Sequence, residues 1–255
     1  MNAYDLIAPY YDLEHASYQD DVDLYLNYAA ATGAPILEIG CGSGRLLLPL
    51  AQQGYEVVGV DSSQVMLKRA QERLNDAGLT HLVKLVEGDA RKLALDQRFR
   101  LAFVGLNSFA QFTTRTEQQA VLTALAAHLV PNGVLLLDLP NADLRRFQQA
   151  EGHLFHQGTW TDAASHELVS HFLAAAYDPV ARIMEVTHFY EVSPQGEALR
   201  RTIVKTSLAW LSQGEAELLV EQQGFRLLHT FGDYELNPCE EGSPRLIVVA
   251  AKTEK

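Results

Sequence analysis

Four polar side chains stand at the ends of short apolar runs in the first half of the chain, where they could bind one ligand together. Glu38 lies at the end of the run ILEIG, and Asp61 follows VVGV. Asp89 follows LVEG, and Asn107 follows FVGL. If these runs are parallel strands, their carboxyl ends meet at one sheet edge, where open α/β sheets bind ligands. A carboxylate at Asp61 can accept from both hydroxyls of a ribose, and one at Asp89 from the exocyclic amine of a purine.

A glycine-rich turn, Gly40-Cys41-Gly42-Ser43-Gly44, follows Glu38. Glycines permit positive φ and let a ligand approach the backbone closely. The N–H groups that open the next helix favour an anionic or carboxylate group. Arg45 stands where the dinucleotide fingerprint G-x-G-x-x-G has its third glycine. The turn therefore disfavours a nicotinamide dinucleotide and leaves other nucleotide cofactors open.

A parallel sheet is needed to position these residues, and the pattern from about residue 35 predicts one. Short apolar runs alternate with amphipathic stretches, which is typical of doubly wound α/β folds. Gly54, Gly78 and Gly133 are expected at or just beyond helix ends, where a left-handed residue costs least. We expect strands at 35–39, 55–60, 82–86, 99–105 and 133–139, and helices at 45–53, 64–77 and 117–130.

The pattern changes after about residue 150. Three strands are expected at 168–177, 182–192 and 199–210, joined by turn sequences. A helix then begins at Ser212, which forms a capping box with Glu215. Strands at 225–231 and 245–251 complete the main sheet.

We therefore predict one domain over 1–255. Its core, 34–150 and 211–255, is a doubly wound, mostly parallel seven-stranded sheet. Residues 151–210 form an inserted antiparallel β lobe over the active site. Residues 1–33 form an N-terminal helical cap, with a helix that starts at Asp20 or Asp21 and ends near residue 31.

Composition limits the partners. The net charge is −12, and the basic residues form no stripe of the kind that nucleic-acid binders use. We expect no nucleic acid and no anionic membrane as partner, and a neutral or cationic small substrate. The two cysteines, Cys41 and Cys239, can build neither a disulfide framework nor a four-ligand zinc site. We therefore expect no metal. We expect a cytoplasmic protein, because no signal peptide or long apolar run is present. The oligomeric state is not encoded in any pattern we recognise.

The segments ILEIGCGSGR, VVGVDSSQVML, VEGDA and LVPNGVLLLDL resemble, in order and spacing, the motif series of class I S-adenosylmethionine-dependent methyltransferases. The match covers about residues 35–140. The start of the chain, YDLIAPYYDLE, resembles the N-terminal cap of small-molecule methyltransferases of this superfamily. The resemblance implies a Rossmann-like methyltransferase fold and S-adenosyl-L-methionine as cofactor.

The resemblance also implies a role for each matching residue. Glu38 would hold the amino group of the cofactor's methionine part, Asp61 the ribose and Asp89 the adenine amine. The other implied contacts are Gly40, Cys41, Gly42 and Gly44 in the turn beside the methionine part, Ser62 and Met66 beside the adenine, Ala90 at a ring nitrogen, Asn107 near the methyl group, and Tyr11 or Tyr4 from the cap.

The expected reaction is in-line methyl transfer to a nitrogen or oxygen of a small molecule. A neutral amine needs no base, whereas an alcohol benefits from one, and the sequence assigns none. Asp138, at the end of the fifth strand, could face the acceptor. Aminopropyl transfer, a non-catalytic cofactor-binding regulator and, third, a nicotinamide oxidoreductase remain as alternatives.

Five histidines fall in or beside the inserted lobe: His153, His156, His166, His171 and His188. No acid partner stands at a recognisable spacing from them. We therefore favour strand-surface or core histidines over a metal site or a general base.

Overall fold

The computed structural model describes residues 2–141, 152–193 and 198–254. The chain forms two compact units. The described part of the smaller unit is 2–18, 152–193 and 198–209, and that of the larger unit is 19–141 and 210–254. Residues 19–33, which we assigned to an N-terminal cap, belong to the larger unit.

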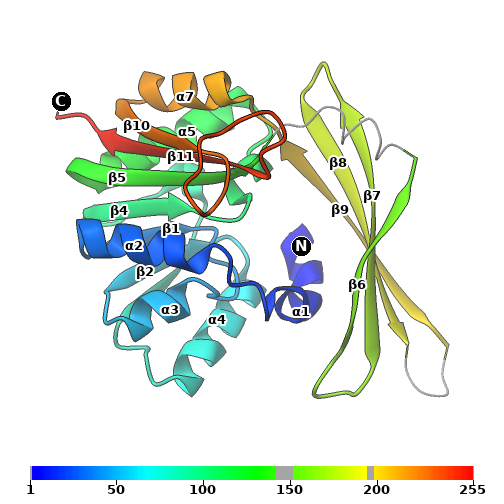
Figure 1. The fold of residues 1–255 in the computed structure, drawn as a ribbon. Coiled ribbons are helices and arrows are strands. Elements are labelled where there is room, and N and C mark those ends of the chain that lie inside the picture. Colours follow the sequence, from blue (N-terminus) through cyan, green and yellow to red (C-terminus); the bar gives the residue numbers. More distant parts are fainter. Residues whose placement is uncertain (1, 142–151, 194–197, 255) are drawn as a thin grey trace. The chain divides into compact units, whose positions relative to one another are not determined.

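The larger unit is built on a seven-stranded sheet with the order β10-β11-β5-β4-β1-β2-β3 (Figure 1). The five strands from β3 to β5 in that order are parallel, and β11 is antiparallel to both of its neighbours. This confirms the predicted mostly parallel sheet. The strands are β1 (Ile36–Ile39), β2 (Val57–Asp61), β3 (Val83–Glu87), β4 (Phe99–Val104), β5 (Leu129–Pro140), β10 (Phe225–Phe231) and β11 (Arg245–Lys252).

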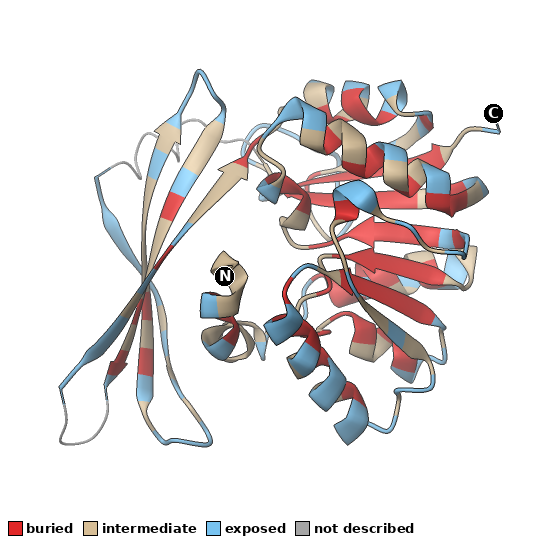
Figure 2. Cartoon of the chain, turned by 180° about the vertical axis from the view of Figure 1, so that it is seen from behind, coloured by how far each residue is buried: buried red, intermediate tan, exposed pale blue. Residues whose placement is uncertain are grey.

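The central strands of this sheet form the core of the larger unit. All residues of β1 are buried, and so is every residue of β11 between its two ends (Figure 2). Strands buried on both faces read as continuous apolar runs, which is why the sequence pattern located them.

Three helices of the larger unit, α4, α5 and α7, begin at recognisable side-chain caps. Ser63 accepts from the Met66 N–H at the start of α4, and Ser212 forms the predicted capping box with Glu215 at the start of α7. None of the described helices is long and apolar enough to span a bilayer. The helical elements are α2 (Val22–Thr32), α3 (Leu47–Gln52), α4 (Gln64–Asp76), α5 (Arg115–His128), α7 (Gln213–Gln222) and the 3₁₀ turns η1 (Ala90–Lys92) and η2 (Ser108–Gln111).

One glycine was assigned wrongly. Gly54 and Gly78 have the expected positive φ, 84° and 71°. Gly133 instead lies inside β5, and the left-handed residue is Asn132, with φ 60°. Gly133 is required for space, because a Cβ there would lie 2.9 Å from the carbonyl oxygen of Val130.

The smaller unit is a four-stranded antiparallel sheet, β6-β7-β8-β9, with helix α1 (Ala3–His15) on one face. Ile7 of α1 packs with Tyr190 and Val204, and Tyr10 stacks on Tyr190 at 4.3 Å between ring centroids. The strands are β6 (Leu154–Thr161), β7 (Leu168–Asp178), β8 (Ile183–Ser193) and β9 (Arg200–Ala209). The last three were predicted, and α1 falls within the predicted helical cap, 1–33, although its bounds were not given; β6 was not predicted.

Candidate functional site

The glycine turn lies directly after β1 and is held open by its backbone. Gly40 and Gly42 have φ 71° and 53°, values that L side chains rarely adopt. A Cβ at Gly40 would come within 2.8 Å of Ser108, whereas one at Gly42 would meet nothing within 4 Å. The backbone at Gly42 is therefore the point of the turn that a ligand can approach.

Asp61, at the end of β2, fixes the turn from the neighbouring strand. Its carboxylate accepts from the N–H of Gly42 at 2.8 Å and from that of Ser63 at 2.8 Å. Ser62 beside it is exposed, and Met66 is buried in the first turn of α4. A carboxylate offers about four lone-pair sites, so Asp61 can hold the turn and still accept from a bound hydroxyl.

Glu38 is a buried carboxylate beside this turn, with a relative exposure of 3%. Its Oε2 is buried and makes no hydrogen bond to any described residue. Arg45, the cation that acts on it most, directs its guanidinium at Asp21, with N–O distances of 2.7 and 2.6 Å. Burial raises the pKa of Glu38 well above its usual value, and Arg45 offsets only part of this.

A buried carboxylate oxygen without a donor is costly, so a site of this kind favours a ligand that supplies one. An ammonium group would satisfy Glu38, and its positive charge would favour the ionised carboxylate. The residues around the turn therefore fit the amino group of a bound amino acid.

The loop after β4 has an unusual backbone. Leu106 and Asn107 have φ 41° and 67°, two left-handed residues in succession. Such conformations cost energy and persist only where the surroundings hold them. Asp138 accepts from the Leu106 N–H at 3.0 Å, and Arg245 donates to Oδ1 of Asn107 at 2.9 Å.

Asp138 does not face an acceptor, and the expectation that it could is wrong. Its side chain is fully buried at the end of β5. Arg245 donates to Oδ1 from Nε at 2.8 Å and also from Nη2, and the Tyr234 hydroxyl donates to Oδ2 at 3.0 Å. Burial raises the pKa of Asp138, and the Arg245 charge and hydrogen bonds oppose the rise. The residue anchors the loop instead.

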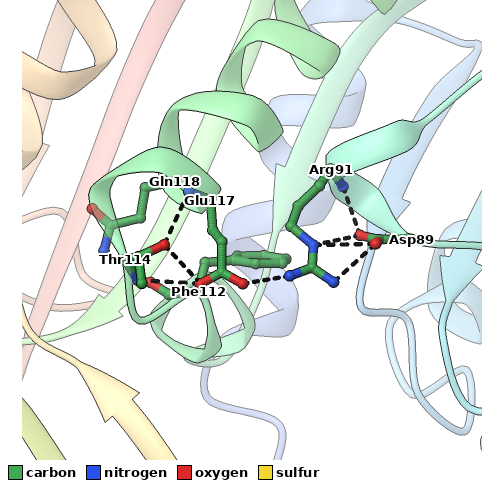
Figure 3. Close-up of polar contacts among 6 residues, drawn as sticks. All are labelled: Asp89, Arg91, Phe112, Thr114, Glu117 and Gln118. Carbon is green, nitrogen blue, oxygen red and sulfur yellow. Dashed lines mark hydrogen bonds and ion pairs between the residues drawn. The ribbon is translucent and has the colours of Figure 1, made fainter.

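Asp89 follows β3 and caps η1, accepting from the backbone N–H of Arg91 at 2.9 Å (Figure 3). The Arg91 guanidinium donates to the same carboxylate from Nε and Nη2, both at 2.9 Å, and its Nη1 contacts Glu117 of α5. These hydrogen bonds hold the pKa of Asp89 below its usual value. Ala90 beside it is buried. The adenine role of Asp89 and Ala90 stays a prediction.

Cys41 is buried, as expected for a small packed residue. Burial raises the pKa of its thiol well above the usual range, which disfavours the nucleophilic thiolate. Tyr11 lies in α1 of the smaller unit, where its ring stacks on His15 at 4.2 Å. Its predicted cofactor contact stays a prediction.

The larger unit thus brings the expected residues to one edge of its sheet. Gly88, just before Asp89, donates to the Asp61 carbonyl at 3.0 Å. Ser108, just after Asn107, lies against Gly40. Glu38, the turn, Asp61, Asp89 and Asn107 all lie at or just beyond the carboxyl ends of β1 to β4, as the sequence predicted.

The smaller unit contains a second polar cluster, which the sequence did not predict. His171 and His188 are hydrogen-bonded through Nε2 and Nδ1 at 3.1 Å, and Nδ1 of His171 lies 2.6 Å from Oε1 of Glu14. The sequence showed no acid at a recognisable spacing from these histidines, and Glu14 is far from both in sequence. The acid comes from α1, so no local spacing could have indicated it.

Comparisons with known proteins agree with this geometry. A family model described as a methyltransferase domain matches residues 36–133, which span β1 to the start of β5. The cypemycin N-terminal methyltransferase of a Streptomyces species is 27% identical over 229 residues, 85% of this chain and 82% of the relative.

One further relative matches about half of the chain, and one solved structure matches nearly all of it. The dTDP-3-amino-3,6-dideoxy-alpha-D-glucopyranose N,N-dimethyltransferase of Streptomyces fradiae is 31% identical over 139 residues, 52% of either chain. The solved structure of the CcbJ methyltransferase from Streptomyces caelestis has a TM-score of 0.81 at 26% identity and covers 98% of both chains. The motifs, the geometry of the sheet edge and these similarities agree: residues 36–133 form a methyltransferase domain of the class I S-adenosylmethionine-dependent type, and its cofactor is S-adenosylmethionine.

Proposed function

We propose that the protein methylates an amine nitrogen of a small molecule. The observation that supports this most is that two sequence relatives, the cypemycin and the amino-sugar enzymes, are named for methylation at an amino nitrogen. The net charge of −12 suits an acceptor that arrives as an ammonium ion, because a negative field raises the local concentration of cations.

The cofactor is held, in this proposal, by the residues inferred from the sequence. Glu38 takes the amino group with its otherwise unpaired oxygen, and Asp61 takes the ribose while it holds Gly42. Asp89 takes the adenine amine and has to share its carboxylate with Arg91. When bound, the cofactor supplies an electrophilic methyl group on a sulfonium, so these residues need only bind and orient it.

The smaller unit is proposed to recognise the acceptor, and Tyr11 of that unit keeps its proposed role as a cofactor contact. The matched family segment, 36–133, lies entirely in the larger unit, so the smaller unit is where acceptor choice can vary within the family. We further propose a cytoplasmic location, where both thiols stay reduced, and no nucleic-acid partner.

The test is methyl transfer by the full-length chain to a panel of amines. The panel contains dTDP-linked amino sugars, peptides with a free N-terminus, and counterparts with a hydroxyl in place of the amine. Release of S-adenosylhomocysteine is followed, and products are identified by mass. We expect methylation of amines alone.

Asp61→Ala should abolish the activity, whereas Asp76→Ala, which removes an exposed carboxylate near the end of α4, should leave it unchanged. Methylation of the hydroxyl compounds would show that the acceptor is an alcohol and that the proposed amine acceptor is wrong. Cofactor binding without any turnover would indicate a regulatory protein.

A further inference from the structure

The larger unit contains a buried ion pair beside the glycine turn. Arg45 follows Gly44 at the end of the turn, and its guanidinium donates to both carboxylate oxygens of Asp21, at 2.7 and 2.6 Å. Only 9% of the Arg45 side chain is exposed, and none of the Asp21 side chain. A bidentate pair of this kind fixes the direction of the guanidinium as well as its distance.

Asp21 lies where an acid usually has another task. It is the N-cap residue of α2, and an aspartate at this position usually accepts from a backbone N–H of the first helical turn. The Asp21 side chain makes no such hydrogen bond. Both of its oxygens are directed at Arg45 instead, so α2 begins without this cap and the carboxylate serves the ion pair.

The same arginine acts on Glu38, the buried acid at the end of β1. Burial raises the pKa of Glu38 well above its usual value, Arg45 lowers it, and the charges of Asp21 and Asp61 raise it. Asp21 therefore opposes, at Glu38, the effect of the cation that it binds. Oε2 of Glu38 is buried and accepts no hydrogen bond from any described residue, although an arginine lies near enough to act on its charge.

The remaining described neighbours of Glu38 bring no charge that could replace this arginine. Tyr25 of α2 and Cys41 of the turn interact with Glu38, and burial raises the pKa of both, so each keeps its proton. The residues paired with Glu38 on the two neighbouring strands are Gly59 and Phe103, which carry no titratable group. The charge at Glu38 is thus set by Arg45 and the acids around it.

We propose that Asp21 is a positioning residue that binds Arg45 and thereby keeps Glu38 open for the amino group of the cofactor. This inference rests on the proposed role of Glu38 in binding that group. An arginine is always charged and has five donor hydrogens, so it would compete with the ammonium for the same oxygen. With Arg45 held by Asp21, each of the two carboxylates has one cation when the cofactor is bound.

The pair also explains why the motif series does not contain this feature. Arg45 and Glu38 lie inside the matched family segment, 36–133, whereas Asp21 lies outside it. Asp21 and Arg45 are 24 positions apart in the sequence. A residue that follows no motif therefore controls one that does.

The first measurement needs only the full-length wild type and two ligands. One ligand is S-adenosylhomocysteine, and the other is its analogue with a hydrogen in place of the amino group. The ratio of their dissociation constants, measured by calorimetry, reports what the amino group contributes. We expect S-adenosylhomocysteine to bind at least about tenfold more tightly, the scale of a hydrogen bond to a charged group, and Glu38→Gln to remove this preference.

The pH dependence of this ratio tests where Arg45 is directed in the wild type. A proton competes with the ammonium for Glu38 as long as Arg45 is bound to Asp21. The preference for S-adenosylhomocysteine should therefore rise from about pH 6 to about pH 8, well above the ordinary pKa of a glutamate, about 4.3. A preference that is constant over this range would mean that Glu38 is already ionised by Arg45, and the inference would be wrong.

The variant that tests the pair is Asp21→Asn. Asparagine carries no charge, so Arg45 can turn to Glu38, and its positive charge then opposes the ammonium. At mildly alkaline pH the preference for S-adenosylhomocysteine should fall about tenfold, the scale of one neighbouring charge. The matched control is Asp23→Asn, which removes the same charge from an exposed position in the first turn of α2 and should leave the preference unchanged.

A double variant separates positioning from a loss of structure. Asp21→Asn leaves Arg45 buried without its acid, which can lower stability by itself. In Asp21→Asn combined with Arg45→Gln, both charges are gone and no arginine remains to compete for Glu38. We expect this double variant to regain most of the preference for S-adenosylhomocysteine, although it lacks the ion pair.

The outcomes distinguish this inference from the proposed role of Glu38. If Asp21→Asn keeps the full preference, or if the double variant loses as much as Asp21→Asn, the ion pair has only a structural role and the inference is overturned. An equal loss in Asp23→Asn would overturn it too, because the effect would then be one of overall charge. If the wild type shows no preference for the amino group, the role of Glu38 itself is wrong, and the inference falls with it.

Discussion

Glu38 of the larger unit and Glu14 of the smaller unit are both shielded from water, but their surroundings differ. Each has a buried carboxylate oxygen without a hydrogen bond to the described residues, but that of Glu14 lies 2.6 Å from Nδ1 of the His171 imidazole. Two other buried acids of the larger unit, Asp21 and Asp138, have an arginine in place instead. An arginine is always charged, so its pairs are permanent, whereas an imidazole or an unpaired oxygen can respond to a proton or a ligand.

This difference separates the acids that an arginine holds permanently from those that can respond to a ligand or a proton. Asp138 and Arg245 fix the loop at Leu106 and Asn107, and Asp21 and Arg45 join the segment before α2 to the one before α3. Neither Glu38 nor Glu14 forms such an ion pair with an arginine among the described residues. The comparison predicts that losing an arginine costs stability, and that neutralising Glu38 costs binding.

The largest effect is expected for Arg245→Leu, which leaves Asp138 buried without its cation. Removing one partner of a buried ion pair costs about 3–5 kcal/mol. We expect a loss of that size in the free energy of unfolding, measured by urea denaturation without ligand.

Arg115→Leu is the control, because its exposed guanidinium donates to Gln222 at 2.9 Å. Its effect should stay within about 0.5 kcal/mol. If Arg245→Leu lowers the free energy of unfolding by as little, the proposed difference between acids paired with arginine and acids without such a pair would be wrong.

The sequence indicated the larger unit well because the information there is local. Each strand, its turn and the acid after it are consecutive, and buried parallel strands appear as apolar runs. Asp138 was misassigned because its partner Arg245 reaches it only through the pairing of β11 with β5. Side chains on two strands that pair so far apart in sequence leave no spacing to recognise.

The smaller unit shows the opposite case. Pro9 lies inside α1, and because proline usually ends a helix, the sequence did not indicate the bounds of α1. In β6, Gly158 and an irregular register between His156 and Gly158 break the alternation typical of a strand. The proximity of Glu14 and His171 depends on how α1 packs on the sheet, which the predicted helical cap, 1–33, did not specify.

The second prediction concerns Glu38→Gln. The amide cannot pair with an ammonium as a carboxylate does, and a hydrogen bond to a charged group is worth about 1.5–3 kcal/mol. Affinity for S-adenosylhomocysteine, measured by calorimetry, should therefore fall at least tenfold, roughly 1.4 kcal/mol. Glu221→Gln, an exposed neutralisation in α7, should leave the affinity unchanged.

Without ligand the same change should stabilise the protein, with a defined pH dependence. The folded pKa of Glu38 is raised by burial, so its contribution to stability is present below its unfolded pKa, about 4.3, and is lost as the pH rises through the folded value. Unfolding free energies of the wild type and Glu38→Gln should thus converge in acid and separate toward neutral pH, with the variant more stable. A variant that is less stable at neutral pH would mean that Glu38 already has a partner.

The smallest effect is expected for Arg91→Ala, where an arginine meets an exposed acid. The side chains of Arg91 and Asp89 are 41% and 31% exposed, so the pair is worth only about 0–1 kcal/mol. Stability should change by no more than that. If Asp89 binds the adenine amine, releasing it from Arg91 should raise the affinity for S-adenosylhomocysteine, by at most about fivefold on the scale of 1.4 kcal/mol per factor of ten.

Lys92→Ala removes the same charge from the next position and is the matched control. Lys92→Ala removes a positive charge without releasing Asp89. A gain in affinity confined to Arg91→Ala would therefore assign Asp89 to the ligand. A gain shared by both variants would indicate a general field effect, and a loss confined to Arg91→Ala would mean that the guanidinium itself contacts the ligand. In that last case a permanent charge would take part in binding, and the division drawn between Asp138 and Glu38 would hold only for acids that are buried.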